Sequence, residues 1–332
     1  MNNNRKRIFY LDALRCLGII LVIEGHIWDY GYGIKVYDSL SRQIFYSFNM
    51  PLFFFISGFL AYRGNVTFSD TLRFISKKFV YLVVPALLFL MYYSFLSKES
   101  PFAFLIEGTK GYWFTITLWE CFFVYYVINL ILRNSRWSVW VQITISIAGV
   151  LFLSFNNEIG PSLIDFNRFA KYFQFFTLGV LSMKYRFIYE KLVRSELLKT
   201  VSMISFFLIL AILNYGCLPS LLFHVSRDVV LRYLGTFIII SCFVSYESQF
   251  YIQSRFNSGI LDIGRKSLAI YLIQYFFIPD FKPILPKVSL LDDFSLHVLA
   301  FIYTAFVILA CYIIITLLSN SKFLNKYLLG QK

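Results

Sequence analysis

Charged residues are scarce in this sequence. Asp, Glu, Lys and Arg make up 15% of the 332 residues, whereas hydrophobic residues make up 58%. Soluble domains average about 25% charged residues, so the composition excludes a water-facing enzyme and a disordered chain and predicts a membrane protein. Cysteine is scarce too, with five in the chain and no CxxC or Cys/His metal spacing. The sequence therefore predicts no structural disulfide and no metal site.

Long apolar stretches fill most of the chain instead. A helix needs about 20 mostly apolar residues to span a bilayer, and ten stretches meet or nearly meet this length. They lie near residues 8–29, 44–62, 79–97, 112–132, 137–155, 167–185, 199–217, 228–246, 264–279 and 297–318. This pattern predicts an all-α polytopic membrane protein with about ten transmembrane helices. We expect a single domain over residues 1–332 and no appended soluble domain.

Lys and Arg outnumber Asp and Glu by 31 to 18, and the resulting formal net charge of +13 is by itself compatible with nucleic acid binding. Their distribution argues against it. With ten spans and a cytoplasmic amino terminus, 20 of the 31 cations fall on the cytoplasmic side, 8 outside and 3 within spans. The positive-inside rule therefore predicts both termini in the cytoplasm of a plasma (inner) membrane protein. The expected surroundings are a lipid bilayer and no nucleic acid.

The first apolar stretch is interrupted by Asp12, Arg15, Glu24 and His26, so it predicts an uncleaved span rather than a signal peptide. A charge at the centre of a spanning helix costs roughly 2.5 to 3.5 kcal/mol. Polar groups at such depth are functional candidates by default. The plainer alternative is a buried polar cluster that only fixes helix packing.

The positions of these polar groups along the helix are informative. Arg15 and His26 are separated by eleven residues, so they point within about 20° of each other, about 16 Å apart along the axis. Asp12 is placed to pair with Arg15, and Asp29, one turn beyond His26, to orient its ring. Glu24 points to another face. Arg15 and His26 are the leading candidates for catalysis.

These residues form part of a longer pattern. Arg15, ten residues and then His26, preceded by Leu11 and Asp12, resemble the signature of the acyltransferase-3 family of membrane acyltransferases. Similar motifs recur in order: Met50-Pro51-Leu52-Phe53-Phe54-Phe55-Ile56-Ser57-Gly58-Phe59-Leu60, Tyr112-Trp113-Phe114, and Ser267-Leu268-Ala269-Ile270-Tyr271-Leu272-Ile273-Gln274. Ten spans also suit the family's architecture.

Two positions depart from the family pattern. Tyr81, before Pro85, stands where members commonly carry the second Arg of an Arg-x-x-Arg pair. Gln274 stands where many members carry His. Glutamine cannot take a proton near neutral pH, so a second general base there is not expected. We therefore expect His26 to be the catalytic imidazole, with His224 and His297 at outer membrane edges.

The resemblance implies transfer of an acyl group, expected to be acetyl, from cytoplasmic acetyl-CoA to a hydroxyl of an extracytoplasmic glycan or lipid-linked sugar. In this reaction His26 is the general base or a transient acyl carrier. Arg15 suits a donor phosphate or a fixed countercharge. Three further cations lie near the expected cytoplasmic mouth and either bind coenzyme A phosphates or serve only as topology signals: Arg73, Lys77 and Lys78.

Other residues are candidates for substrate binding or support. Trp113 belongs either to an interfacial aromatic belt or to the substrate path, and Tyr271 and Gln274 either to the core or to the site. Glu120 is expected to pair with Arg15, Lys171 or Arg232, or to bind substrate. Asp12 and Asp29 support Arg15 and His26.

Two other classes of function remain open from the sequence. A secondary transporter or a flippase of a lipid-linked sugar would also keep Arg15, Glu24 and His26 inside a helical bundle. A non-enzymatic scaffold would leave the costly polar face of the first helix unexplained. The sequence leaves the acceptor and the oligomeric state undetermined.

Overall fold

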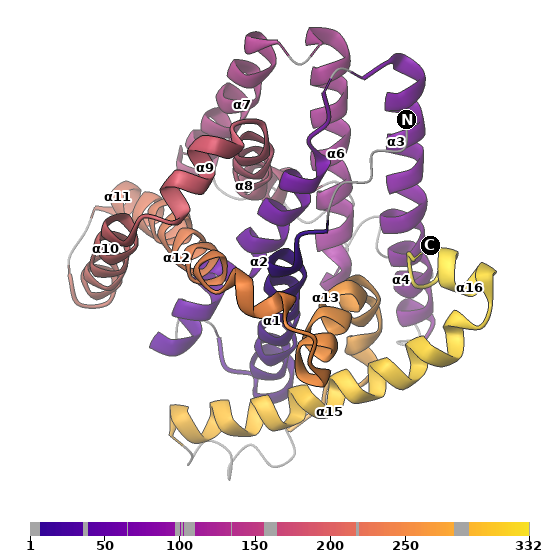
Figure 1. Ribbon diagram of the computed structural model, residues 1–332. Helices are drawn as coiled ribbons and strands as arrows, with labels where there is room; N and C mark the ends of the chain where they lie inside the picture. The colour runs from indigo at the N-terminus through magenta and orange to yellow at the C-terminus, as the bar shows by residue number, and fades with distance from the viewer. Residues whose placement is uncertain are drawn as a thin grey trace.

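The chain forms a bundle of helices in a computed structural model (Figure 1). The structure describes residues 7–35, 39–64, 66–96, 100, 102, 110–133, 135–155, 165–216, 219–281 and 292–331. Within these residues every regular element is a helix and no strand occurs. The all-α prediction is therefore confirmed for the described part of the chain.

All ten predicted stretches are helical. The long elements are α1 (Phe9–His26), α2 (Leu40–Ala61), α3 (Phe68–Lys78) continued by η3 (Phe79–Val83) and α4 (Val84–Leu96), α6 (Trp113–Leu132), α7 (Arg136–Phe155), α8 (Phe166–Lys184), α10 (Glu196–Tyr215), α12 (Leu231–Ser245), α13 (Arg255–Ile273) and α15 (Asp293–Ser319). Shorter elements connect them: η1 (Ile27–Tyr32), η4 (Lys110–Tyr112), α9 (Arg186–Val193), α11 (Ser220–Val225), η5 (Ser226–Val230), η6 (Glu247–Tyr251), η7 (Gln274–Phe276) and α16 (Lys322–Tyr327).

Seven of these helical segments are long and apolar enough to cross a membrane. Three of the ten predicted spans, α1, α8 and α13, fall outside this group, and each carries at least three Asp, Glu, Lys or Arg residues. Such helices need protein partners for their polar faces. A multi-pass membrane protein is thus supported, whereas the count of ten spans and the sides of the termini stay predictions.

Two predicted spans begin well after the helices that contain them. The third was expected at residues 79–97, but its helical segment begins at Phe68. The ninth was expected at residues 264–279, but α13 begins at Arg255 and ends at Ile273. The early start of α13 follows from a helix cap, because the Ser254 hydroxyl accepts the backbone N–H of Asn257 at 3.0 Å. The charged residues that shorten the apolar run therefore lie inside the helix.

The polar helix α1 lies at the centre of the bundle. Thirteen of its 18 residues are buried, and α2, α12, α13 and α15 all pack against it. The approach to α13 is especially close, since a Cβ built on Gly264 would lie 1.9 Å from the Asp12 carbonyl oxygen. By contrast, only 11% of the span in α10 is buried, so α10 lies at the periphery. The costly polar residues of α1 are thereby surrounded by protein.

Candidate functional site

The first helix is regular from Phe9 to His26. The expected common face of Arg15 and His26 therefore holds in the structure. At the amino-terminal end, Asp12 accepts hydrogen bonds from Arg7 at 2.6 Å and from Arg15 at 3.2 Å. The predicted pair between Asp12 and Arg15 is present, and it fixes the guanidinium at the edge of the bundle.

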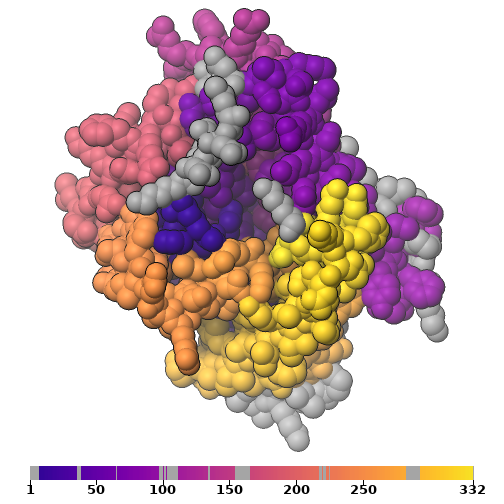
Figure 2. All heavy atoms as spheres, turned by 45° about the vertical axis from the view of Figure 1, so that its right-hand side comes forward, coloured from indigo at the N-terminus to yellow at the C-terminus, as the bar shows by residue number. Residues whose placement is uncertain are grey.

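A cation-lined cavity of about 350 Å³ opens beside Arg15. Arg63, Lys77 and Lys78 line it together with Arg15, and Tyr81 contributes to the same wall. In Figure 2 the indigo atoms of the N-terminal segment lie deep in a hollow between purple, orange and yellow segments. Arg63, one of the cations counted only as a topology signal, is a member of this site that sequence reasoning missed.

Aromatic rings hold two of these cations at the cavity wall. The Arg63 guanidinium lies 4.0 Å from the centre of the Phe74 ring, and the Lys78 ammonium 4.1 Å from the centre of the Phe122 ring. Such contacts orient a cation without neutralising its charge. The cavity is therefore suited to an anion.

A second cavity of about 220 Å³ continues from the first into the bundle. The two share Arg15, Ser57 and Lys78 in their linings, and the second extends to Tyr271 and Phe114. The basic mouth thereby adjoins buried residues of the Ser267–Gln274 motif. This arrangement was not visible in the sequence, because its walls come from helices far apart along the chain.

A cluster of tyrosines links the inner cavity to His26. The hydroxyl groups of Tyr271 and Tyr275 both donate to the carbonyl oxygen of Gly111, at 2.5 and 2.9 Å. The Tyr275 oxygen also lies 3.2 Å from His26 Nε2. Position 111 must be glycine for this packing, because a Cβ there would lie 2.3 Å from the Tyr275 ring.

The Tyr275 hydroxyl holds one side of the imidazole. A carbonyl oxygen only accepts, so Tyr275 donates to Gly111 while its oxygen lies 3.2 Å from His26 Nε2. Nδ1 makes no conventional hydrogen bond to the described residues. Gln274 also faces the ring, and its amide nitrogen donates to the Tyr271 carbonyl at 3.2 Å, which leaves its amide oxygen for the imidazole. The phenol and the amide therefore position the ring for proton transfer.

The predicted partner of His26 was wrong. Asp29 does not orient the ring; its carboxylate accepts a hydrogen bond from Arg42 at 2.6 Å. The change to a wider π-helical turn at Ile27 displaces Asp29 from the regular α-helical register on which the prediction relied. The ring is held instead by Tyr275, which follows Gln274 directly in the sequence.

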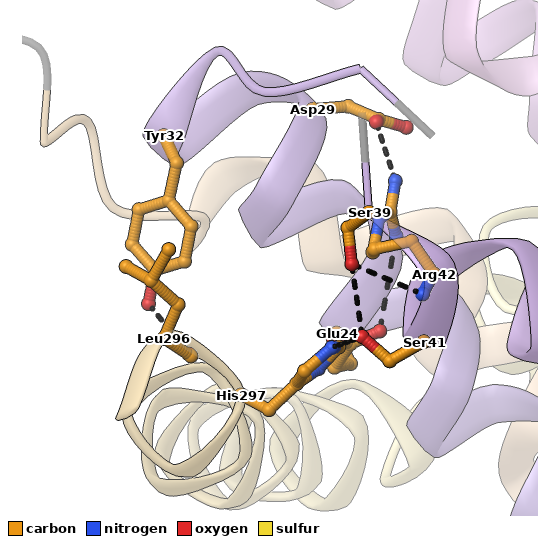
Figure 3. A network of polar contacts seen from close by, with 8 residues as sticks. All are labelled: Glu24, Asp29, Tyr32, Ser39, Ser41, Arg42, Leu296 and His297. Carbon is orange, nitrogen blue, oxygen red and sulfur yellow. Dashed lines mark hydrogen bonds and ion pairs between the residues drawn. The ribbon is translucent and has the colours of Figure 1, made fainter. Parts of the chain in front are cut away.

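Glu24 belongs to a different polar network at the same end of α1 (Figure 3). Its carboxylate is fully buried and accepts from His297 Nδ1 at 2.8 Å, with Arg42 at 3.8 Å from the other oxygen. His297, expected at an outer membrane edge without a role, lies near the start of α15 and also contacts the hydroxyl of Ser41. Sequence reasoning missed this network, because Glu24 and His297 are 273 positions apart.

Two other candidates occupy different surroundings. Arg73 is exposed on α3 and is not among the residues that line the two cavities. Trp113 is half-buried and stacks on Tyr172 at 5.3 Å between ring centres. The guanidinium of Arg168 lies over the Trp113 ring, 4.8 Å from its centre. Trp113 is thus at the site's periphery rather than at the imidazole.

Glu120 does not make the pairs expected for it. Arg15 pairs with Asp12, while Lys171 and Arg232 both pair with Asp228, at 3.0 and 3.1 Å. Neither carboxylate oxygen of Glu120 has a hydrogen-bond partner among the described residues, although both are buried. A carboxylate in this position has capacity for a ligand or a proton.

Comparison with known proteins is consistent with this geometry. A family model described as an acyltransferase domain (acyltransferase family 3) matches residues 8–316. The chain belongs to the acyltransferase-3 family. The match includes the cations of the mouth, the inner cavity, the tyrosine cluster and both His26 and His297. No curated protein and no solved structure matches the chain. Membership in an acyltransferase family supports acyl transfer and lends no support to the transporter or flippase alternative.

Proposed function

We propose that the protein transfers an acetyl group from cytoplasmic acetyl-CoA to a hydroxyl of an extracytoplasmic glycan or lipid-linked sugar, in the plasma (inner) membrane. The observation that carries the proposal is the pair of adjoining cavities, with Arg15 and Lys78 in both linings, between the cation-lined mouth and Tyr271. The hydrogen bonds through Gly111 and Tyr275 then lead to His26. Donor and acceptor thus approach one imidazole from two directions.

The mouth supplies binding groups for the donor. Arg15, Arg63, Lys77 and Lys78 lie around one cavity and match the phosphate groups of coenzyme A in charge. The narrower inner cavity, with its apolar wall at Phe114 and Leu118, suits the thioester arm. Arg15 lines both cavities, so in this arrangement it lies where the donor passes from the mouth to the inner cavity.

Direct transfer is the mechanism we favour. His26 takes the proton of the acceptor hydroxyl, and the acceptor oxygen attacks the thioester carbonyl carbon. The carbon–sulfur bond breaks, the coenzyme A thiolate leaves, and the proton returns from His26 to the sulfur. Tyr275 at Nε2 holds the ring and accepts from the imidazolium. Transient acylation of His26 is the second route, since imidazole is itself a nucleophile.

The direction across the membrane follows from the distribution of cations. The predicted cytoplasmic segments hold 20 of the 31 Lys and Arg residues, including Arg63, Lys77 and Lys78 at the mouth. The donor would therefore enter from the cytoplasm and the acceptor from the opposite side. The natural acceptor is a hydroxyl-bearing surface glycan or its lipid-linked precursor.

The test is transfer of radiolabelled acetyl from acetyl-CoA to isolated surface glycan by the purified, detergent-solubilised protein. We expect label to enter the glycan as a base-labile ester. His26→Ala should abolish this transfer while the thermal unfolding of the protein stays cooperative. Full transfer by that variant would contradict the role given to His26. Burst kinetics with labelled protein would favour the acyl-His26 route over direct transfer.

A further inference from the structure

A second set of nucleophilic and titratable residues lies outside the path just described (Figure 3). Ser41 Oγ is 2.6 Å from His297 Nε2, and His297 Nδ1 is 2.8 Å from Glu24 Oε1. The three residues come from α2, α15 and α1. This order of atoms, from hydroxyl to Nε2 and from Nδ1 to carboxylate, is that of the serine–histidine–acid triads of hydrolases and acyltransferases.

The surrounding hydrogen bonds allow one assignment of the protons. Ionised Glu24 only accepts, so His297 carries its proton on Nδ1 and its Nε2 accepts from the Ser41 hydroxyl. Ser39 Oγ lies 2.9 Å from Ser41 Oγ and accepts the backbone N–H of Arg42. The Ser39 hydroxyl therefore donates to Ser41. Every polar contact in this chain then holds Ser41 in the state in which a base removes its proton.

Packing holds the imidazole in this orientation. The His297 ring lies 4.6 Å from the Trp28 ring and 5.6 Å from the Phe45 ring, between ring centres. Tyr32 fixes the backbone at the preceding residue, because its hydroxyl donates to the Leu296 carbonyl at 3.3 Å. Because two neighbouring rings already restrict the His297 side chain, it loses little conformational entropy when it acts as a base.

The Glu24 carboxylate lies where positive charge develops when the serine loses its proton. It accepts from His297 Nδ1 at 2.8 Å, so it stabilises the ring in the transition state. Arg42 lies beside the other oxygen of Glu24, at 3.8 Å, and binds Asp29 at 2.6 Å, which holds the carboxylate in place.

The start of α2 provides donors for a developing oxyanion. Ser41 is the second residue of this 22-residue helix, before its first intrahelical N–H bond. The N–H groups of Leu40 and Ser41 point out of the helix end, where the helix dipole favours negative charge. Ser41 itself is partly exposed, so a ligand can reach its hydroxyl.

We propose that Ser41, His297 and Glu24 form a second acyl-transfer centre, which takes a short-chain carboxylic ester of a hydroxyl-bearing carrier. Ser41 Oγ attacks the ester carbonyl carbon and its proton moves to His297 Nε2. The ester carbon–oxygen bond breaks, and the leaving alcohol takes the proton from His297. Water or a second hydroxyl then removes the acyl group from Ser41 by the reverse sequence, with His297 again as base.

The substrate class follows from the site and from the proposed function. The product of acetyl transfer at His26 is a carboxylic ester, and Ser41 would move or remove such an acyl group. Only this source of the ester rests on the proposed function; the reactivity of Ser41 does not. A rigid packing network with no chemistry would have the same contacts but no reactive serine.

The experiment uses the full chain in detergent and a fluorophosphonate probe, which phosphonylates an activated serine with loss of fluoride. We expect one tag per chain, located at Ser41 by peptide mass spectrometry. Ser41→Ala should remove the tag and His297→Gln should slow tagging at least about 100-fold. Ser47→Ala, which removes another serine hydroxyl of α2, one that donates to the Ile44 carbonyl at 2.7 Å, is the matched control and should keep the tag at Ser41.

Two results would overturn the second centre: a cooperatively folding wild-type chain that takes no tag at Ser41, or tagging at an unchanged rate in His297→Gln. The wild-type result decides the matter even if His297→Gln fails to fold. His26→Ala separates the two proposals. That variant should lose acetyl transfer and keep the tag at Ser41. A wild-type protein that is tagged but transfers no acetyl would overturn only the proposed function, whereas one that transfers acetyl but is not tagged would overturn only the second centre.

Discussion

Two imidazoles lie near the same end of α1, but their surroundings differ. His26 contacts the phenol of Tyr275 and the amide of Gln274, both neutral. His297 is held between the carboxylate of Glu24 and the hydroxyl of Ser41. A base without a fixed nucleophile can act on an external hydroxyl, whereas a base bonded to its own serine activates that serine. The partner, not the residue type, therefore separates the two proposed roles.

The largest expected effect tests this separation directly. His26→Ala should lower acetyl transfer from acetyl-CoA by about 10²- to 10⁴-fold, because a general base is lost. The measurement is initial rate of label incorporation at saturating donor. If His297→Ala removes transfer and His26→Ala does not, the two roles are exchanged.

The second prediction concerns the charges around His297. Glu24→Gln should destabilise the protein by about 3 to 5 kcal/mol, because it breaks a buried charge network and leaves Arg42 without one of its two carboxylates. Thermal unfolding in detergent gives the measurement. Glu190→Gln is the matched control: its pair with Arg186 is about half-exposed and should contribute less than about 1 kcal/mol. Equal shifts for both variants would argue against a buried, ionised Glu24.

A third change tests the part of α1 that is proposed to bind acetyl-CoA. Arg15→Lys keeps the charge but loses the two-pronged guanidinium, so the KM for acetyl-CoA should rise roughly tenfold. Arg73→Lys, at an exposed position outside the cavity linings, should change it less than about twofold. Steady-state kinetics with varied acetyl-CoA measures both. An unchanged KM in Arg15→Lys would indicate that Arg15 serves only as a fixed countercharge.

The smallest effect is expected at the tyrosine that holds His26. Tyr275→Phe removes one hydroxyl but keeps the ring against Gly111, so the loss corresponds to one hydrogen bond, about 0.5 to 1.5 kcal/mol. This predicts a fall in the transfer rate of roughly two- to tenfold. Tagging of Ser41 by fluorophosphonate should not respond. A fall in tagging as large as the fall in transfer would show that the two imidazoles are coupled.

Much of this arrangement was predictable from local pattern. Helices follow from apolar runs and from hydrogen bonds between near neighbours, so all ten predicted stretches are helical. The common face of Arg15 and His26 follows from helical periodicity within one element. The start of α13 was missed, because the Ser254 cap contributes more to the boundary than the apolar run that begins later.

Contacts between elements were not predictable. The partner of Asp29 was predicted from proximity along a helix, and that of Glu120 from charge alone. In the structure Asp29 binds Arg42, and Glu120 does not pair with the expected cations. The sequence by itself determined the membrane-type helices and the polar face of α1, since both depend on local hydrogen bonding and composition. Only the tertiary structure brought Ser41 to His297 across 256 positions and Tyr275 to Gly111 across 164, because long-range packing selects such pairs.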